Sequence, residues 1–241
     1  MIHAMPNKFT DLLSHLASRL GASSLDAGMD SRDLGGVIWD LCWKFFRGNL
    51  RKPFTCCKGL LLLGRRVVVR SGHRLHSVGP LVVEDYAEIQ ALARQGLHFG
   101  KKVTIGRFAQ IRPSGYYGRE MGEGLIVGDF SNIGPECFIG CGGLIRIGAR
   151  VMMGAKVHMH AEAHVTENPS KPMQEQGIRR SGIIIGDDCW LGAGCVILDG
   201  VELGKGCVVG AGTVVTKSFS ENSVIAGVPA RLLRLRKAES L

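Results

Sequence analysis

A repeat of six residues sets the hydrophobic pattern between Ile185 and Ser220. The chain reads IGDDCW, LGAGCV, ILDGVE, LGKGCV, VGAGTV and VTKSFS, and each hexad starts with Ile, Leu or Val. Most hexads continue with Gly and place a small or apolar residue fifth. This spacing predicts three short parallel strands that form the sides of a triangular coil of about 18 residues. Such coils stack into a solenoid around a column of aliphatic side chains.

The same repeat occurs earlier in the chain. Residues 127–144 read VGDFSN, IGPECF and IGCGGL, and residues 147–164 read IGARVM, MGAKVH and MHAEAH. A weaker start lies at residues 99–110, FGKKVT and IGRFAQ. Polar, Gly-rich stretches at 112–126 and 165–184 interrupt the pattern and are predicted loops. We expect a partial first coil, then two full coils before the second loop and two after it.

The predicted organisation has three parts. Residues 1–75 form a helical, basic and aromatic segment, residues 76–220 form the solenoid with its two loops, and residues 221–241 form a C-terminal segment. The 241 residues include 34 Gly, and only 6% are aromatic. This composition suits the tight corners of a coil better than a bulky globular core.

The first 75 residues have a different character from the rest. Apolar residues at helical spacing predict a helix near the start, at Phe9, Leu12, Leu13, Leu16 and Leu20. Residues 31–75 then carry most of the net charge of +9, with Trp39, Trp43, Phe45, Phe46 and Phe54 interleaved. Two interpretations stay open: a helix that covers the open end of the prism, or a segment that lies on an anionic membrane surface.

Other partners for the basic segment are less favoured. The apolar run GLLLLG is too short to span a bilayer. A nucleic-acid partner is not expected, because no recognised nucleic-acid-binding module surrounds the charge.

The eight cysteines do not form a metal-binding or disulfide pattern. Cys137, Cys189, Cys195 and Cys207 take the fifth place of a hexad, where the pattern requires a small apolar side chain. The chain has no CxxC pair and no secretory signal at its N-terminus. Reduced thiols in a cytoplasmic protein are the simplest explanation.

The loop after residue 164 is the best candidate for chemistry. A polar loop that interrupts a regular solenoid is more often functional than idle. His164 lies where the chain leaves the coils, fixed on one side and accessible on the other. A general base needs this combination of position and access.

Several segments together resemble the hexapeptide-repeat acetyltransferases, especially the sugar O-acetyltransferases of the maltose, nodulation-factor and polysaccharide type. These segments are MHAEAHVTENPSKPMQEQG, then IIIGDDCWLGAGCVILDGVELGKGCVVGAGTVVTKSF, then NSVIAGVPARLLR. The resemblance covers roughly residues 127–235. It implies a left-handed parallel β-helix, which is an exception to the usual right-handed crossover. It also implies a homotrimer with active sites in the clefts between subunits.

The resemblance also implies roles for single residues. His164 matches the catalytic base, which removes the proton of the acceptor hydroxyl while the oxygen attacks the thioester of acetyl-CoA. Further residues match family positions that bind the acetyl donor, acetyl-CoA, through its pantetheine arm, thioester, adenine or phosphates. We call them the donor side: Trp190, Ala193, Ala211, Thr216, Lys217, Arg231 and Arg234. Backbone N–H groups suit an oxyanion, and Lys and Arg suit phosphates.

The acceptor side is less well matched. The stretch CFIGCGGLIR lacks the carboxylate that holds small sugars in the relatives. Tyr116 and Tyr117 in the preceding insert are therefore candidates for acceptor binding. His160 is another candidate, with simple surface exposure as the alternative. Alternating positions on a strand put His158 and His160 on one face. A zinc site at His158, His160 and His164 is nevertheless not expected, because a corner would direct His164 away from the other two.

The resemblance thus implies an acetyl-CoA-dependent O-acetyltransferase that uses no metal and acts on a saccharide in polysaccharide or lipopolysaccharide synthesis. The acceptor could be lipid-linked, at the inner face of the membrane. Two alternatives stay open: an acetyltransferase for a small molecule such as an antibiotic or serine, and a non-catalytic scaffold.

Overall fold

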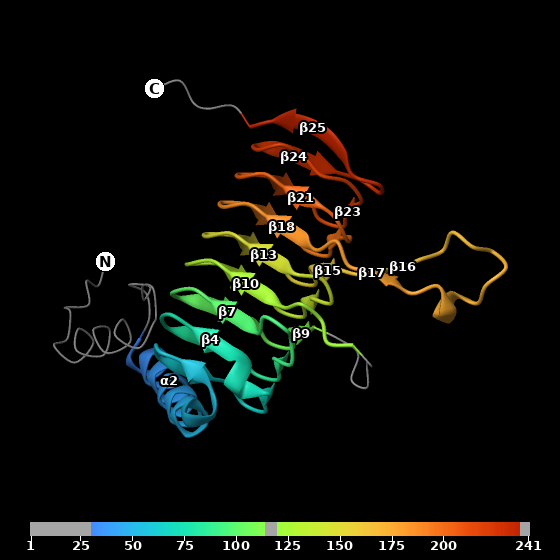
Figure 1. The fold of residues 1–241 in the computed structure, drawn as a ribbon. Coiled ribbons are helices and arrows are strands. Elements are labelled where there is room, and N and C mark those ends of the chain that lie inside the picture. Colours follow the sequence, from blue (N-terminus) through green and yellow to red (C-terminus); the bar gives the residue numbers. More distant parts are fainter. Residues whose placement is uncertain (1–29, 114–119, 237–241) are drawn as a thin grey trace, which may run out of the picture.

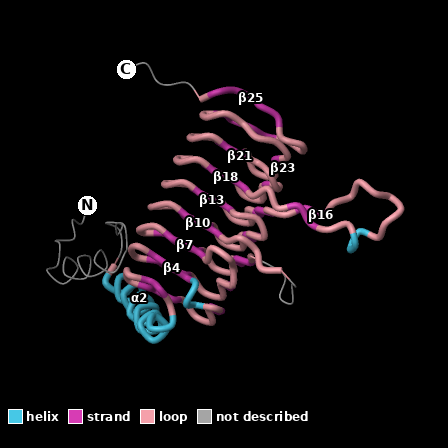
Figure 2. The backbone as a smooth tube through the Cα atoms, viewed as in Figure 1, coloured by secondary structure: helices cyan, strands magenta, loops and turns pink. Residues whose placement is uncertain are grey.

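Short parallel strands stack in three sheets along one axis, as the hexads predict. In the computed structural model, which describes residues 30–113 and 120–236, the chain winds as a three-sided parallel β-helix from α2 at one end to β25 at the other (Figure 1). Figure 2 shows the strands of successive coils in line, with turns at the corners. The first apolar residue of each hexad points inward, so residues such as Phe99, Ile105 and Ile111 are buried.

Each side of the prism is one sheet of hydrogen-bonded strands. Sheet A contains β1 (Cys56–Cys57), β4 (Leu75–Ser77), β7 (Leu97–Phe99), β10 (Leu125–Val127), β13 (Ile145–Ile147), β18 (Ile183–Ile185) and β21 (Glu202–Leu203). Sheet B contains β2 (Leu61–Leu63), β5 (Leu81–Val83), β8 (Val103–Ile105), β11 (Asn132–Ile133), β14 (Met152–Met153), β19 (Trp190–Leu191), β22 (Val208–Val209), β24 (Ser223–Ala226) and the antiparallel β25 (Arg231–Leu235). Sheet C contains β3 (Val68–Arg70), β6 (Glu88–Gln90), β9 (Gln110–Arg112), β12 (Phe138–Gly140), β15 (His158–His160), β20 (Val196–Ile197) and β23 (Val214–Val215).

The connections that vary in length lie at one corner of the prism. From sheet A to sheet B, and from sheet B to sheet C, equivalent positions are six residues apart; His98, Thr104 and Gln110 are an example. The extra residues all run from sheet C to the next strand of sheet A. We call this corner the loop edge; in the described chain it comprises residues 71–74, 91–96, 113, 120–124, 141–144 and 161–182, together with the connections without extra residues at 198–201 and 216–218.

The β-helix begins earlier than the sequence pattern indicated. Strands β1, β2 and β3 already pair in parallel with the next coil, so coiling starts at Cys56 rather than at residue 76. There are accordingly more coils before the second loop than the two and a part that we expected. Insertions at the loop edge cause the difference, because they shift the six-residue register once in every early coil. At the other end, β24 extends sheet B beyond residue 220 to Ala226.

Helix α2 (Ser31–Arg51) lies across the first coil, and the short 3-10 helix η1 (Lys52–Phe54) follows it. The Asp30 side chain caps its start by accepting hydrogen bonds from the backbone of Arg32 and Asp33. Lys44 is 7% exposed and forms ion pairs with Asp40 and with Glu84 of the β-helix. The predicted helical N-terminal segment is therefore present from residue 31, and the helix predicted near residues 9–20 lies outside the described residues.

The interior positions predicted for the cysteines are confirmed. Cys137, Cys189, Cys195 and Cys207 are buried, and all eight cysteines of the chain are free thiols. Burial raises the pKa of the Cys137 thiol to about 11, so this group stays protonated near neutral pH.

Candidate functional site at the loop edge and sheet C

Ion pairs join neighbouring connections along the loop edge. Arg180 contacts Glu120 at 3.2 Å and Glu162 at 3.3 Å, so it links the connection after β9 to both ends of the longest one. One coil lower, Arg94 lies 3.4 Å from Glu123. The Arg180 side chain is only 19% exposed, which makes its two contacts stronger than those of a free surface arginine. In the described part of the loop edge, ion pairs therefore link the connections of neighbouring coils.

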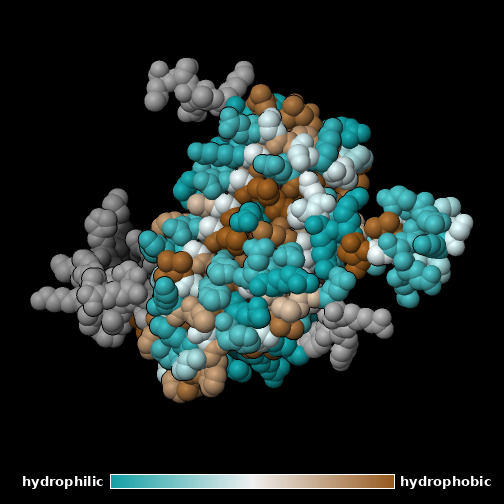
Figure 3. Space-filling model, in the orientation of Figure 1, coloured by the Kyte–Doolittle hydropathy of each residue, from teal (hydrophilic) through white to brown (hydrophobic). Residues whose placement is uncertain are grey.

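His164 lies on an arm that projects from this edge. Strands β16 (Ala163–His164) and β17 (Ile178–Arg179) pair antiparallel, and the chain between them extends away from the prism (Figure 1). The short 3-10 helix η3 (Met173–Glu175) lies near its tip, which is mainly hydrophilic in Figure 3. The His164 side chain is exposed, and no hydrogen bond or ion pair holds its imidazole within the described chain. His164 thus has the access that a base requires, but the described chain supplies no group that orients it.

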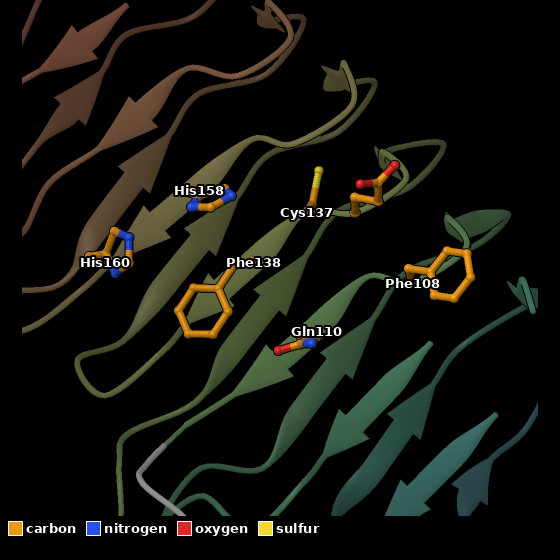
Figure 4. A pocket seen from close by; sticks show the side chains of 7 residues that line it. Phe108, Gln110, Cys137, Phe138, His158 and His160 are labelled. Carbon is orange, nitrogen blue, oxygen red and sulfur yellow. The ribbon is translucent and has the colours of Figure 1, made fainter. Parts of the chain in front are cut away.

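A cavity of about 770 Å³ lies on the outer face of sheet C and extends from Phe108 and Glu136, at the corner between sheets B and C, to His160 beside the loop edge (Figure 4). Phe138 and His158 occupy successive positions on β12 and β15, and Gln110 precedes them on β9. The residues that line the cavity are Phe108, Gln110, Glu136, Cys137, Phe138, His158 and His160. Figure 4 shows the Phe138 ring between Gln110 and the two histidines. The chain reaches His164 four residues after His160, so the cavity and the arm meet at the same edge.

The two histidines of β15 share the outer face of sheet C, as their alternation predicts. Their ring centroids lie 6.1 Å apart, and that of His160 lies 5.4 Å from that of Phe138. Burial lowers the pKa of His160, nearby His158 lowers it further, and Glu162 opposes the shift. His160 is therefore a neutral imidazole near pH 7, able both to donate and to accept a hydrogen bond.

Part of the predicted donor side comes together at the corner between sheets B and C. Ala193 and Ala211 are exposed, occupy equivalent positions in successive coils, and are joined through the bond from the Gly212 N–H to the Ala193 carbonyl at 2.9 Å. Neither alanine N–H donates a hydrogen bond to another residue of the described chain. Arg231 follows Ala230, whose N–H donates to Val214 at the top of sheet C, so this arginine lies near the same corner.

The other predicted donor residues lie apart from this corner. Thr216 and Lys217 follow β23 and lie at the loop edge, with the Lys217 Nζ 5.7 Å from the ring centroid of Phe219. Arg234 pairs with Val224 near the start of β24, and Trp190 is exposed on the face of sheet B. His164 and Ala211 are likewise at different corners. A single chain therefore does not bring the whole predicted site into one cleft.

The sequence missed several residues of the cavity. The sequence pattern places Phe138 in a stretch without a carboxylate and Gln110 in a weak hexad, and it assigns neither residue a role. Phe138 lies one coil before His158, and this position would have identified it as part of the cavity. Recognising the position requires knowledge of the register between coils. Tyr116 and Tyr117 lie outside the described residues. No cluster of three or more potential metal-ligating side chains exists in residues 30–113 and 120–236.

Comparisons with known proteins agree with this fold. Residues 182–217 match the family described as "Hexapeptide repeat of succinyl-transferase". A stretch of 67 residues is 36% identical to WbbJ of Escherichia coli K12, whose name describes a lipopolysaccharide biosynthesis O-acetyl transferase. The match covers 28% of this chain and 34% of that protein, about a third of its length.

Two solved structures share the architecture. AntD, an N-acyltransferase from Bacillus cereus solved with dTDP and 3-hydroxybutyryl-CoA, has a TM-score of 0.54 at 19% identity, over 79% of this chain and 88% of AntD. A second Bacillus cereus protein, described as an acetyltransferase, has a TM-score of 0.50 at 22% identity, over 73% of this chain and 84% of that one. The chain therefore carries the hexapeptide repeat and the left-handed parallel β-helix fold of the acetyltransferases that it resembles.

Proposed function

We propose that the protein transfers the acetyl group of acetyl-CoA to a hydroxyl of a saccharide during polysaccharide or lipopolysaccharide synthesis. The observation that carries the proposal is the position of His164 on an exposed arm beside the cavity of sheet C. The local sequence match to WbbJ supports the oxygen acceptor and the saccharide class.

His164 acts as the general base in this proposal. Its imidazole takes the proton of the acceptor hydroxyl as the oxygen attacks the thioester carbonyl. The carbon–sulfur bond then breaks, the acetyl ester remains on the acceptor, and the CoA sulfur leaves and takes up a proton. A positioned base of this kind accelerates a reaction by about 10²–10⁴-fold.

The donor residues fit a long, polyanionic thioester. The Ala193 and Ala211 N–H groups have no partner in the described chain and lie one coil apart along the same corner. Such N–H groups can bind the amides of the pantetheine arm or a developing oxyanion. Exposed Arg231 at the top of this corner supplies a positive charge for phosphate groups, and Lys217 supplies another at the loop edge.

The test is acetyl-CoA consumption, followed as thiol release, with neutral and lipid-linked saccharide acceptors. We expect acceptor-dependent release that falls at least about 100-fold in His164→Gln. His98→Gln is the matched control, because His98 is an exposed histidine on sheet A. Release that persists in His164→Gln would contradict the role of His164. Serine or an antibiotic as the preferred acceptor would favour a small-molecule enzyme, and absence of CoA binding would favour a scaffold.

We also propose a homotrimer in which adjacent chains complete each site. The separation of His164 and Ala211 at two corners of the prism supports this arrangement, because a neighbouring chain can bring its donor corner to the arm. Cyclic symmetry would then give equivalent clefts around one axis.

A peripheral contact of this cytoplasmic enzyme with the inner membrane surface is the third part of the proposal. Trp39, Trp43 and Phe46 form what we call the aromatic face of α2; they are 68%, 43% and 54% exposed. Lys44 and Arg47 point inward instead, to Glu84 and to the Leu63 carbonyl. Figure 3 shows hydrophobic side chains at this end of the molecule. Exposed Arg65 lines the same pocket as Trp39 and Trp43, and aromatic rings beside a positive charge suit the interface of an anionic bilayer.

Co-sedimentation with vesicles tests the membrane contact. No helix in the described part of the chain is long and apolar enough to cross a bilayer. We expect binding to vesicles of phosphatidylglycerol and phosphatidylcholine that weakens with salt and is lost when Trp39, Trp43 and Phe46 are all changed to Ser. Trp190→Ser, on the face of sheet B, is the control and should bind normally. Unchanged binding of the triple variant would contradict the contact.

A further inference from the structure

The floor of the cavity on sheet C is an aromatic ring that lies over a glycine. A Cβ atom at Gly140 would approach the Phe138 Cε1 atom to 2.9 Å, so the ring leans along the strand into the space that Gly140 leaves. His160 follows Gly140 in the register between coils, and its ring is tilted by 33° from that of Phe138. The Phe138 ring is therefore supported from below and on one side.

The outer side of this ring faces the cavity, where polar groups surround it. Gln110 lies one coil before Phe138 and His158 one coil after it, so an amide and an imidazole flank the ring along the sheet. The Gln110 amide makes no hydrogen bond within the described chain. A flat apolar surface with a few polar groups at its rim is the usual form of a small-molecule site.

The charge of the lining restricts the ligand. None of the residues that line the cavity in the described chain is Lys or Arg, and the one carboxylate, Glu136, lies 3.6 Å from the Lys156 Nζ. Phosphate and carboxylate ligands are normally held by Arg, Lys or several N–H groups. The neutral imidazole of His160 suits a hydroxyl or an amide better than an anion.

The place of the cavity connects it to the proposed reaction. The chain passes from His160 at the end of β15 to His164 on the arm within four residues, a span of at most about 14 Å. A sugar unit in the cavity therefore lies at the edge from which the proposed base projects.

We propose that Phe138 is the stacking platform for an uncharged sugar ring of the acceptor, and that Gln110, His158 and His160 bind its hydroxyl or acetamido groups. The C–H face of a pyranose packs on the ring, because the negative face of an aromatic ring attracts weakly positive C–H groups. The unit in this cavity is a neutral hexose, deoxyhexose or N-acetylhexosamine, rather than an acidic sugar or a nucleoside diphosphate. This inference rests on the proposed function and specifies its acceptor.

Direct binding tests the platform without requiring turnover. Saturation-transfer NMR and titration would use methyl glycosides of glucose, galactose, mannose, rhamnose and N-acetylglucosamine, with methyl glucuronide and UDP-glucose for comparison. We expect at least one neutral glycoside to bind, at least about tenfold more weakly to Phe138→Ala, and nearly normally to Phe138→Tyr. Phe130→Ala is the control, because Phe130 is an exposed Phe at the corner between sheets A and B.

Gly140→Ala separates stacking from folding. Its methyl group would displace the ring rather than remove it, and would also lie 3.2 Å from the backbone carbonyl oxygen of Met159. We therefore expect weaker sugar binding at a temperature at which circular dichroism shows the variant to be fully folded. Three results would overturn the platform: no binding of any neutral glycoside, binding that is unchanged in Phe138→Ala, or a Phe138-dependent preference for glucuronide or UDP-glucose.

Failure of the sugar platform and failure of the proposed acetyltransferase activity would give different results. Phe138-dependent sugar binding without thiol release would keep the platform and contradict the acetyltransferase. Thiol release that depends on His164, with the same acceptor KM in Phe138→Ala, would keep the acetyltransferase and overturn the platform alone.

Discussion

His160 links the candidate site to the pH dependence of stability. Burial and the neighbouring His158 disfavour its charged form, so its pKa is lower in the folded chain than in the unfolded chain, where it is about 6.5. The folded state then binds fewer protons at acid pH. The associated stability is fully present above about pH 6.5 and is lost as the pH falls to the folded-state pKa.

Urea denaturation at pH 7.5 and pH 5.5 measures this effect. We expect the midpoint of the wild type to fall more between these two values than the midpoint of His160→Gln. His73→Gln, at an exposed position, should behave like the wild type. Equal pH dependence of His160→Gln and the wild type would contradict the assignment.

For single residues of the candidate site, the sequence predicted some positions well and others not at all. It placed His158 and His160 on one face, because strand alternation depends only on local order. It did not find Phe138 and Gln110 as their neighbours, because that contact depends on how many residues each connection adds between coils. The hexads that end at Phe138 and His158 are equivalent in the sequence, but only the pairing of β12 with β15 shows that these side chains are neighbours.

Among the elements, α2 offers a direct comparison of two glycines in one helix. A Cβ at Gly48 would collide with the backbone of Leu61 on β2, whereas a Cβ at Gly36 meets nothing within 4 Å. Gly48 therefore allows α2 to lie closely on the first coil, and Gly36 has no such role.

These two sites should respond to alanine in opposite directions. Gly36→Ala should raise stability by up to about 1 kcal/mol, because alanine favours a helix over glycine. Gly48→Ala should lower it by about 1–3 kcal/mol, because the backbone of β2 has no space to yield. Thermal unfolding measures both, and a loss of stability in Gly36→Ala would contradict the open environment of that position.

The lengths of the connections between strands explain why the sequence pattern did not predict the coils near the N-terminus. From Ile185 onward the connections at the corner between sheets C and A add nothing, so the hexads run unbroken and predicted the strands well. Before that, each coil carries extra residues at this corner, and the six-residue repeat is lost although the aliphatic column continues. Leu61, Leu81 and Val103 lie in one such column on sheet B.

For the whole molecule, the important feature is that insertions gather at one corner while the other two stay regular. The loop edge carries His164 and the links from Arg180 to Glu120 and Glu162. The corner between sheets B and C carries the exposed Ala193 and Ala211. A prism with the proposed base at one corner and the proposed donor residues at another is suited to an assembly in which one chain supplies the arm and the next supplies the donor corner.

Mixed assemblies test this division of the site between chains. Neither His164→Ala nor Ala211→Trp should be active alone, because the first lacks the base and the second fills the donor corner. Co-expressed in equal amounts, they should regain about a quarter of wild-type activity, because that share of clefts receives an intact arm from one chain and an intact corner from another. If both residues acted within a single chain, every site in the mixture would carry one defect and no activity would return. Light scattering of the co-expressed protein would show whether the assemblies are trimers.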